Sequence, residues 1–199
     1  MTDRSPGLRE RTRNAVQWEI AESAGSLFAE QGYDETTIDD VAAAIGMSKR
    51  SVFRYFETKE DLVLGKFDAL AGAMLAGLRA RPAGESTWES LRAMLAFLVP
   101  HIDSQGRDAV TAPLQRLIFE TPVLLAGYLK RQHQVQKSVV SILRERAVEA
   151  GRPFAVDDPA PCVLTAAAFG CLMVAQQAWL ENDADSFAEV LDRALSVLD

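Results

Sequence analysis

Apolar residues recur along the chain at the spacing of helix faces. The segment that ends at Gly32 shows this first, with an apolar set spaced three or four residues apart: Val16, Ile20, Ala24, Leu27 and Phe28. Strand signals are almost missing, because no long run alternates apolar and polar residues and no Asn-Gly or Asp-Gly turn occurs. The pattern predicts an all-α protein of about nine helices.

Helix starts are marked by Ser or Thr with an acidic residue three positions later, which is the arrangement of a capping box. Four such pairs occur: Thr37 with Asp40, Thr58 with Asp61, Ser86 with Glu89, and Ser186 with Glu189. Segments rich in proline, glycine or aspartate break the pattern at 81–84, 103–107 and 156–161. In the second part of the chain we therefore expect helices over 86–101, 108–120, 122–151, 161–181 and 186–198.

The segment 37–56 has the pattern of a helix-turn-helix motif. Two short helices are joined by a tight turn at Gly46, and Ala42 is small where the helices must approach. The second helix, capped by Ser48, would turn its apolar side chains inward, Phe53 among them. Its exposed face would then carry groups that can donate to base edges or phosphates: Lys49, Arg50, Ser51 and Arg54. The alternative is a helical hairpin whose charges are only solvated.

Overall charge argues against a nucleic-acid partner, since the formal net charge is −7. The distribution of charge weakens that argument. Residues 47–59 hold four basic side chains against the single acid Glu57, and the first sixteen residues hold four arginines against Asp3 and Glu10. Two local basic patches are compatible with DNA binding, and also with two solvated charge runs.

Residues 9–62 closely resemble the DNA-binding domain of the TetR family of transcriptional regulators. The similarity rests on LFAEQGY at 27–33, TTI at 36–38, VA at 41–42, GMS at 46–48, FRYF at 53–56 and KEDL at 59–62. The resemblance implies a three-helix DNA-binding domain over 1–58 with the helix-turn-helix, and a larger helical ligand-binding and dimerisation domain over 59–199. It also implies a dimeric repressor on a near-palindromic double-stranded operator.

The resemblance assigns individual positions to DNA. Those that match base contacts are Lys49, Arg50 and Ser51, those that match phosphate contacts are Thr37, Tyr55 and Lys59, and Ser48 and Arg54 complete the predicted set. Many family members have tyrosine where this chain has Phe53, so a hydroxyl contact to phosphate is absent or replaced, with Arg54 as one candidate.

Three arginines, Arg9, Arg11 and Arg13, precede or open the first helix. They form either a solvated arm or an arm that adds phosphate or minor-groove contacts.

The chain beyond residue 80 is only loosely similar to known domains. Residues 120–124 and 128–132 resemble the C-terminal domain of actinobacterial regulators, including some associated with mycofactocin clusters, and some of these respond to long-chain acyl-CoA. That likeness implies a small apolar effector of the acyl-CoA type.

The helix expected over 161–181 is apolar nearly all round, which predicts burial on every side and a partner chain. Together with the apolar face of 186–198 it predicts a homodimer through a four-helix interface. A membrane span is not expected, because Pro159, Pro161 and Glu181 bound the apolar run and Gln176-Gln177 interrupt it.

Polar residues among apolar ones are the candidate ligand contacts. His101 and Gln176 would hydrogen-bond the effector, and Phe97, Tyr128 and Met173 would line its pocket. The alternative for each is a satisfied core or interface residue. Cys162 and Cys171 are expected in the core.

Other classes of function find little support in the sequence. With two cysteines and two histidines, neither a disulfide framework nor a metal site is expected, and no cofactor is implied. The polar N-terminus lacks a secretory apolar segment, so a cytoplasmic protein is expected. The alternatives kept open are a helical DNA-binding or interaction protein without ligand control, and a helical enzyme, for which no catalytic constellation is evident.

Overall fold

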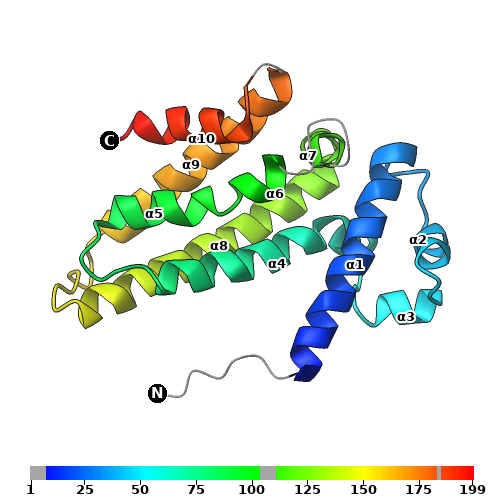
Figure 1. Ribbon diagram of the computed structural model, residues 1–199, viewed down its shortest axis with the longest axis horizontal. Helices are drawn as coiled ribbons and strands as arrows, with labels where there is room; N and C mark the ends of the chain where they lie inside the picture. Colours follow the sequence, from blue (N-terminus) through cyan, green and yellow to red (C-terminus); the bar gives the residue numbers. More distant parts are fainter. Residues whose placement is uncertain (1–7, 104–110, 183–184) are drawn as a thin grey trace. The chain divides into compact units, whose positions relative to one another are not determined.

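A computed structural model describes residues 8–103, 111–182 and 185–199, and every regular element in these ranges is a helix (Figure 1). The helices are α1 (Leu8–Gln31), α2 (Ile38–Ala44), α3 (Lys49–Phe53), α4 (Lys59–Arg79), α5 (Thr87–Ala96), α6 (Val99–Asp103), α7 (Thr111–Glu120), α8 (Pro122–Glu149), α9 (Ala160–Glu181) and α10 (Phe187–Ser196). The all-α prediction is confirmed.

The chain divides into two compact units. The first contains residues up to Ala69 together with Ala112–Tyr128, and the second contains Leu70–Thr111 together with Leu129–Asp199. Both α4 and α8 therefore begin in the first unit and end in the second. The sequence predicts a boundary between two domains at residue 58. This domain boundary stays a prediction.

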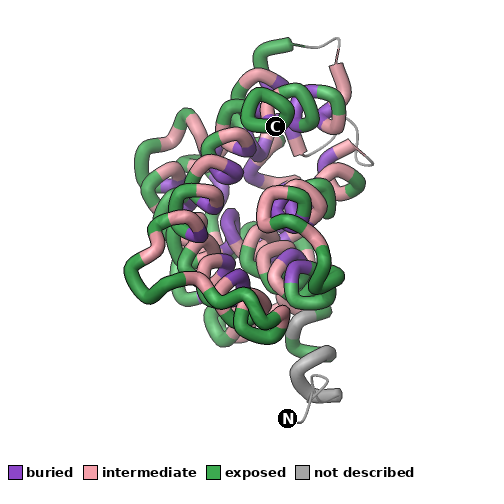
Figure 2. Tube along the Cα trace, turned by 90° about the vertical axis from the view of Figure 1, so that its left-hand side faces the viewer, coloured by how far each residue is buried: buried purple, intermediate pink, exposed green. Residues whose placement is uncertain are grey.

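The first unit is organised by α1, which contacts α2, and by α2, which contacts α3. Phe28, Val41, Val52 and Leu62 are fully buried there, one from each of the first four helices. Gly65 allows a close approach, because a Cβ at this position would lie 2.5 Å from the ring of Phe56. Figure 2 shows buried and exposed stretches alternating along the helices, as expected when each has one apolar face.

The second unit is built on α9, which packs against α5 and α10. α10 is amphipathic, and the ring of its Phe187 meets that of Trp179 edge-on at 6.1 Å between centroids. Asp103 at the end of α6 accepts hydrogen bonds from the first two backbone N–H groups of α10, at 2.9 Å and 3.3 Å. This carboxylate supplements the predicted capping box at Ser186 and Glu189, which is formed.

The helix expected over 86–101 is divided in the structure. It begins at the predicted Ser86 cap, but α5 ends at Ala96 and α6 starts at Val99. Pro100 explains the division, since it has no N–H to donate to the carbonyl of Ala96 and is tolerated only in the first turn of a new helix.

By length and composition alone, α9 could cross a membrane, and no other described helix meets that test. Nine of its residues are nevertheless buried within the protein. This is the pattern of a core helix in the second unit.

Candidate nucleic-acid interface

The predicted capping box forms at the N-terminus of α2, and this helix start is exposed to solvent. The backbone N–H of Thr37 donates to Asp40 Oδ2 at 2.7 Å, and the N–H of Asp40 donates to Thr37 Oγ1 at 3.2 Å. The hydroxyl and the backbone N–H of Thr37 both hold the pKa of Asp40 below its ordinary value. Thr37 is therefore fixed at an exposed helix start, where the remaining N–H groups favour a phosphate.

The turn between α2 and α3 depends on Gly46. Its φ of +66° lies in the left-handed region, and the next residue closes the turn through a 2.8 Å bond from the Met47 N–H to the carbonyl of Ala42. Ser48 then caps α3 by accepting from the N–H of Ser51 at 3.2 Å. Val52 and Phe56 are buried and anchor α3 to the unit.

The outer face of α3 carries Lys49, Arg50, Phe53 and Arg54, all of them exposed. The prediction that Phe53 packs inward is wrong, because 43% of this residue is accessible to solvent. Helix geometry gives the reason: residues 49, 50 and 53 share one face, whereas Val52 and Phe56 share the other. Sequence spacing alone did not distinguish Phe53 from these two apolar neighbours. Ser51 is half-buried, and its hydroxyl lies 2.9 Å from that of Ser48.

Lys49 is paired within the motif. Its Nζ lies 2.6 Å from Asp39 Oδ2 on α2, and both side chains are at least half exposed. Such exposed pairs contribute only about 0–1 kcal/mol, so DNA can displace the carboxylate. The sequence pattern did not identify Asp39 as a partner of the predicted base-contacting residues.

Tyr55 lies between two arginines. The guanidinium carbons of Arg54 and Arg13 lie 5.3 Å and 6.0 Å from the centre of its ring, and Gln17 Nε2 donates to its carbonyl at 3.2 Å. Arg13 is thereby placed beside a predicted phosphate contact. Arg9 and Arg11 belong to the first turn of α1, and their side chains lie outside the described residues.

Lys59 is the first residue of α4, and its ammonium group lies near two aromatic rings. Its Nζ lies 4.2 Å from the ring centre of Tyr33 and 5.8 Å from that of Phe28. The hydroxyl of Tyr33 donates to Glu60 Oε1 at 2.7 Å, which is the main reason that the pKa of Glu60 is lowered. Burial, followed by this contact with Glu60, raises the pKa of Tyr33. Tyr33 and Glu60 lie in the quoted LFAEQGY and KEDL motifs, but their mutual contact was not foreseen.

Four of the five predicted ligand residues belong to the second unit. Phe97 and His101 lie together, with ring centres 4.8 Å apart and His101 Nδ1 3.0 Å from the carbonyl of Phe97. On α9, Gln176 is buried and Met173 is half-buried. Tyr128 belongs to the first unit, where it is buried against the rings of Phe67 and Phe119 at 5.3 Å and 5.9 Å.

α9 presents a second, apolar surface. We call its exposed positions three or four residues apart the α9 stripe: Val163, Ala166, Gly170 and Val174. Burial of α9 on every side was predicted to need a partner chain, and this exposed face in the single chain is compatible with that prediction. Cys162, expected in the core, is exposed next to the stripe, and Cys171 is only partly buried.

The apolar face of α10 was predicted to join the dimer interface, but the structure uses most of it within one protomer. Phe187, Val190, Leu191 and Leu195 are all buried in the single chain, where α10 packs on α9. The sequence could not show which of two apolar helices covers the other. In the two segments predicted to form the interface, the α9 stripe stays exposed, as do Val197 and Leu198 just after the end of α10.

Family models match the two parts of the chain separately. The model of bacterial regulatory proteins of the tetR family matches residues 19–65, which include the helix-turn-helix. The model of the MftR C-terminal domain matches residues 85–199. Together these matches cover the exposed face of α3 and the whole of α9.

Two relatives and one solved structure agree with these matches. The HTH-type transcriptional regulator TcmR of Streptomyces glaucescens is 32% identical over 149 residues, which make up 73% of this chain and 66% of TcmR. The mycofactocin biosynthesis transcriptional regulator MftR of Mycobacterium tuberculosis is 24% identical over 188 residues, covering 94% of this chain and 91% of MftR. The fatty acid degradation regulator FadR of Bacillus halodurans shares the fold, with a TM-score of 0.63, 20% identity and coverage of 92% and 97% of the two chains.

Proposed function

This chain belongs to the TetR family of bacterial regulatory proteins and is a DNA-binding transcriptional regulator; we propose that it is a repressor that binds a near-palindromic operator as a homodimer, under the control of a small apolar effector. The observation that carries the proposal is the exposed face of α3, which holds three cationic side chains on a helix anchored by Val52 and Phe56. A helix of this kind enters the major groove, where guanidinium groups donate to guanine edges.

Each group at the interface has a distinct role in this proposal. Lys49, Arg50 and Ser51 contact bases, with Ser48 and Arg54 beside them. Thr37, Tyr55 and Lys59 hold phosphates and fix the register of α3. The stack of Lys59 on Tyr33 supports this role, since the ammonium group is oriented before DNA arrives. Arg9, Arg11 and Arg13 form an arm that adds contacts to the backbone or minor groove.

Phe53 replaces a polar contact with an apolar one. Its exposed ring lies on the same face of α3 as Lys49 and Arg50. A ring in that position suits the C5-methyl group of thymine, which is the apolar feature of the major groove. We therefore expect a thymine opposite Phe53 in the preferred operator.

Dimerisation uses the α9 stripe. Alanine and glycine in the stripe allow two copies of α9 to approach closely, and the exposed valines are covered when they do. Residues 161–181 and 186–198 thus form the interface, with α10 acting chiefly as the support that holds α9 in place. Two recognition helices related by a two-fold axis require half-sites about 34–36 Å apart or a multiple of that distance.

The effector binds in the domain over 59–199, and a small molecule with an apolar chain, such as an acyl-CoA, is proposed. The match to the MftR C-terminal domain supports a ligand-binding role for this part. The proposed contacts lie in the second unit and are Phe97, His101, Met173 and Gln176. As a regulator of bacterial DNA the protein acts in the cytoplasm, with no cofactor and no catalytic step.

The experiment that tests the proposal is selection of operators from a random duplex library by the purified protein, followed by competition against non-specific DNA. We expect an inverted repeat, and roughly 10³-fold or greater preference for it. Binding that is equal for all duplexes would contradict a sequence-specific regulator. Palmitoyl-CoA is then added to the operator complex, and affinity that stays unchanged with it and with other lipophilic compounds would favour a DNA-binding protein without ligand control.

A further inference from the structure

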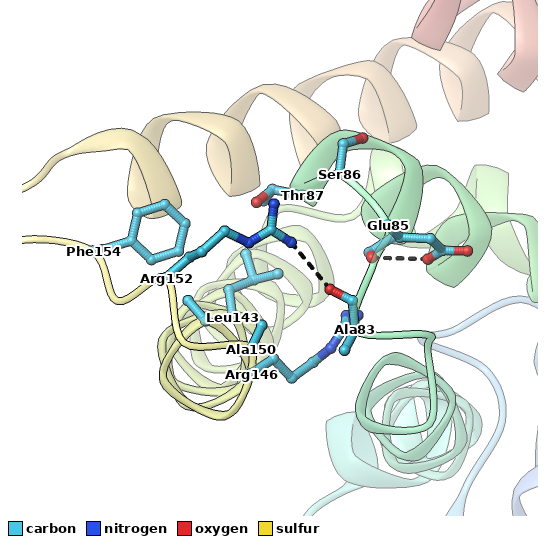
Figure 3. A pocket seen from close by; sticks show the side chains of 11 residues that line it. Ala83, Glu85, Ser86, Thr87, Leu143, Arg146, Ala150, Arg152 and Phe154 are labelled. Atoms are coloured by element: carbon cyan, nitrogen blue, oxygen red, sulfur yellow. Dashed lines mark hydrogen bonds between the residues drawn. The ribbon is translucent and has the colours of Figure 1, made fainter.

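A hollow of about 240 Å³ lies in the second unit, away from the residues assigned to DNA or effector (Figure 3). Two segments form it: residues 83–90, which lead into α5, and residues 143–154, which end α8 and continue into the following loop. Its wall on the second segment is apolar, with Leu143, Ala147, Ala150 and Phe154. The other wall is formed by Ala83, Glu85, Ser86, Thr87 and Ser90, and Arg146 and Arg152 also line the hollow.

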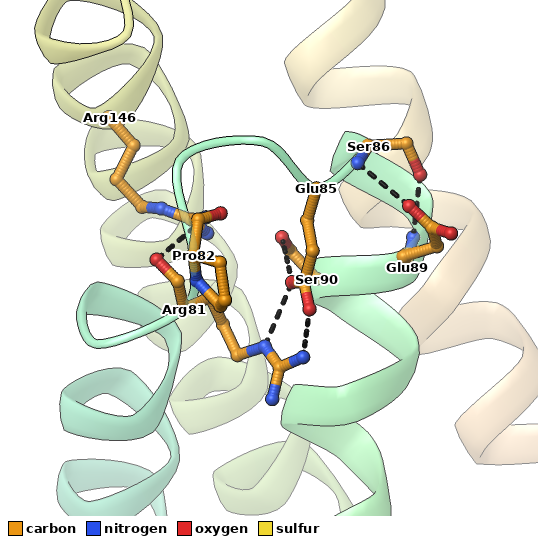
Figure 4. A network of polar contacts seen from close by, with 7 residues as sticks. All are labelled: Arg81, Pro82, Glu85, Ser86, Glu89, Ser90 and Arg146. Atoms are coloured by element: carbon orange, nitrogen blue, oxygen red, sulfur yellow. Dashed lines mark hydrogen bonds and ion pairs between the residues drawn. The ribbon is translucent and has the colours of Figure 1, made fainter.

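The one acidic residue of the hollow is already neutralised. Arg81 binds both carboxylate oxygens of Glu85, with Nε 2.8 Å from Oε2, and Ser90 Oγ donates to Oε2 at 2.9 Å (Figure 4). These contacts, with the bond from Arg81 as the largest cause, hold the pKa of Glu85 below its ordinary value. The carboxylate is therefore held mainly by Arg81, which does not line the hollow, and Arg146 adds a smaller electrostatic contribution. The two arginines that line the hollow still outnumber its one carboxylate.

Arg146 and Arg152 use only part of their donor capacity. Arg146 Nη2 donates to the carbonyls of Arg81 and Pro82, at 3.3 Å and 3.0 Å. Arg152 Nη2 donates to the carbonyl of Ala83 at 3.3 Å, and Figure 3 shows it reaching across the hollow to do so. A guanidinium group has five N–H donors, and neither arginine pairs with a carboxylate of any described residue. The N–H groups of Nε and Nη1 are therefore available to an anion.

The start of α5 borders the hollow and is already capped. Ser86 Oγ accepts from the N–H of Glu89, and the Glu89 carboxylate accepts from the N–H of Ser86, which offsets part of the partial positive charge of the helix start. The feature that distinguishes the hollow is therefore its two guanidinium groups beside an apolar wall.

We propose that this hollow is a binding site for a small organic anion, whose carboxylate or phosphate group is held by Arg146 and Arg152 and whose apolar part lies against Phe154 and the alanines of α8. None of the residues predicted to contact the apolar effector lines it. It is therefore a second ligand site, and it goes beyond the proposed function.

The test is calorimetric titration of the full-length protein without DNA, at constant ionic strength. The probes are phenyl phosphate, benzoate, their neutral analogue benzamide, and inorganic phosphate. We expect phenyl phosphate and benzoate to bind and to compete with each other, and benzamide and inorganic phosphate to bind much more weakly. Arg152→Gln should weaken phenyl phosphate binding by roughly ten- to a hundredfold, since it removes charge-assisted hydrogen bonds. The exposed Lys137 on α8 provides the charge-matched control, and Lys137→Gln should bind as the unchanged protein does.

Arg146→Gln is a less direct variant, because Arg146 also holds the turn at 81–82. Ala147→Phe, which fills the apolar wall, provides a second line of evidence and should abolish binding while the helical circular dichroism is kept. The proposal is overturned if benzamide binds as tightly as benzoate, if inorganic phosphate equals phenyl phosphate, or if Arg152→Gln and Ala147→Phe leave binding unchanged. No DNA is present, so failure here is distinct from failure of operator binding.

Discussion

The exposed faces of α3 and α9 differ in chemistry and indicate different partners. α3 presents Lys49, Arg50 and Arg54 around one aromatic ring, whereas the α9 stripe presents valine, alanine and glycine. Charges act over about 8–10 Å in physiological salt and weaken as salt is added. Apolar contacts act only at close approach and contribute roughly 25 cal/mol for each Å² removed from water. The first face is suited to a polyanion, and the second to a copy of itself.

The largest expected effect comes from placing charge in the α9 stripe. Val174→Asp would bury an unpaired carboxylate in each half of the dimer, which costs about 3–5 kcal/mol, or roughly a hundred- to several-thousandfold in the dissociation constant. Sedimentation equilibrium measures this constant. Val156→Asp is the matched control, because Val156 is 97% exposed on a loop outside α9. A dimer that survives Val174→Asp would remove the stripe from the interface. Aspartate at the buried Leu172 would test folding of the protomer instead.

The corresponding change on α3 is Arg50→Ala. If Arg50 donates two hydrogen bonds to a base, its loss costs about 1–3 kcal/mol of operator affinity in each half-site and relaxes preference at one base pair of each half-site. Fluorescence anisotropy with the selected operator and its single-base variants measures both. Arg79→Ala, also exposed but at the end of α4, should leave both unchanged. Unaltered preference in Arg50→Ala would exclude this side chain from base recognition.

Lys59→Gln distinguishes a phosphate contact, which contributes to affinity for any sequence, from a base contact, which sets sequence preference. Loss of one phosphate contact in each protomer should reduce the slope of log affinity against log salt by about two for the dimer. Preference among operators should be kept, because phosphate contacts carry no sequence information directly. Affinity measured between 50 mM and 300 mM salt gives the slope, with Lys137→Gln as the charge-matched control. Dimerisation through the apolar α9 stripe should show no comparable salt dependence.

The proposed contact between Phe53 and a thymine methyl group can be tested by removing each partner in turn. Replacing thymine by uracil opposite Phe53 should cost the unchanged protein about 0.8 kcal/mol, and should cost Phe53→Ala almost nothing. The two changes form a double-mutant cycle measured by operator affinity. A thymine outside the half-sites is the control position. Additive effects of the two changes would show that the ring does not contact that methyl group.

The last prediction concerns protein stability rather than DNA affinity, and it tests the contact between Tyr33 and Glu60 beneath Lys59. Tyr33→Phe keeps the ring but removes the hydroxyl that donates to Glu60, and should cost about 0.5–1.5 kcal/mol of stability at pH 7. The pKa of Glu60 is lowered in the folded state, so this contribution is present above the unfolded value of about 4.3 and is lost as pH falls through the folded value. Denaturant unfolding at pH 7 and pH 3 should therefore show the two proteins converging in acid. A gap that stays constant over this range would contradict the linkage.

Local signals were predicted well from the sequence. The boxes at Thr37, Ser86 and Ser186 involve partners three residues apart, and the Thr58 and Asp61 pair forms as well, with bonds of 3.0 Å and 3.1 Å. The cation-bearing face of α3 follows from the same short-range spacing. Such features need no knowledge of distant contacts, because one turn of helix contains all of their atoms.

Features that depend on packing were predicted poorly. Phe53 and Phe56 are both aromatic and three residues apart, yet only contact with the rest of the unit decides which is buried. As a sequence pattern, the apolar face of α10 is equally compatible with burial against a partner chain and with burial against α9 of the same chain. The hollow near Arg152 joins two segments of the chain that lie far apart in sequence. Each of these outcomes is set by tertiary neighbours rather than by local periodicity.

The contact between Asp39 and Lys49 has a consequence for how DNA binding should be measured. The operator must displace the Asp39 carboxylate before Lys49 can contact DNA, and this carboxylate is then left unpaired near a polyanion. Among the residues described, Arg50 and Arg54 form no such ion pair. Lys49 should therefore add less to operator affinity than either arginine. The salt slope does not report this difference, because it counts cations released from the DNA phosphates.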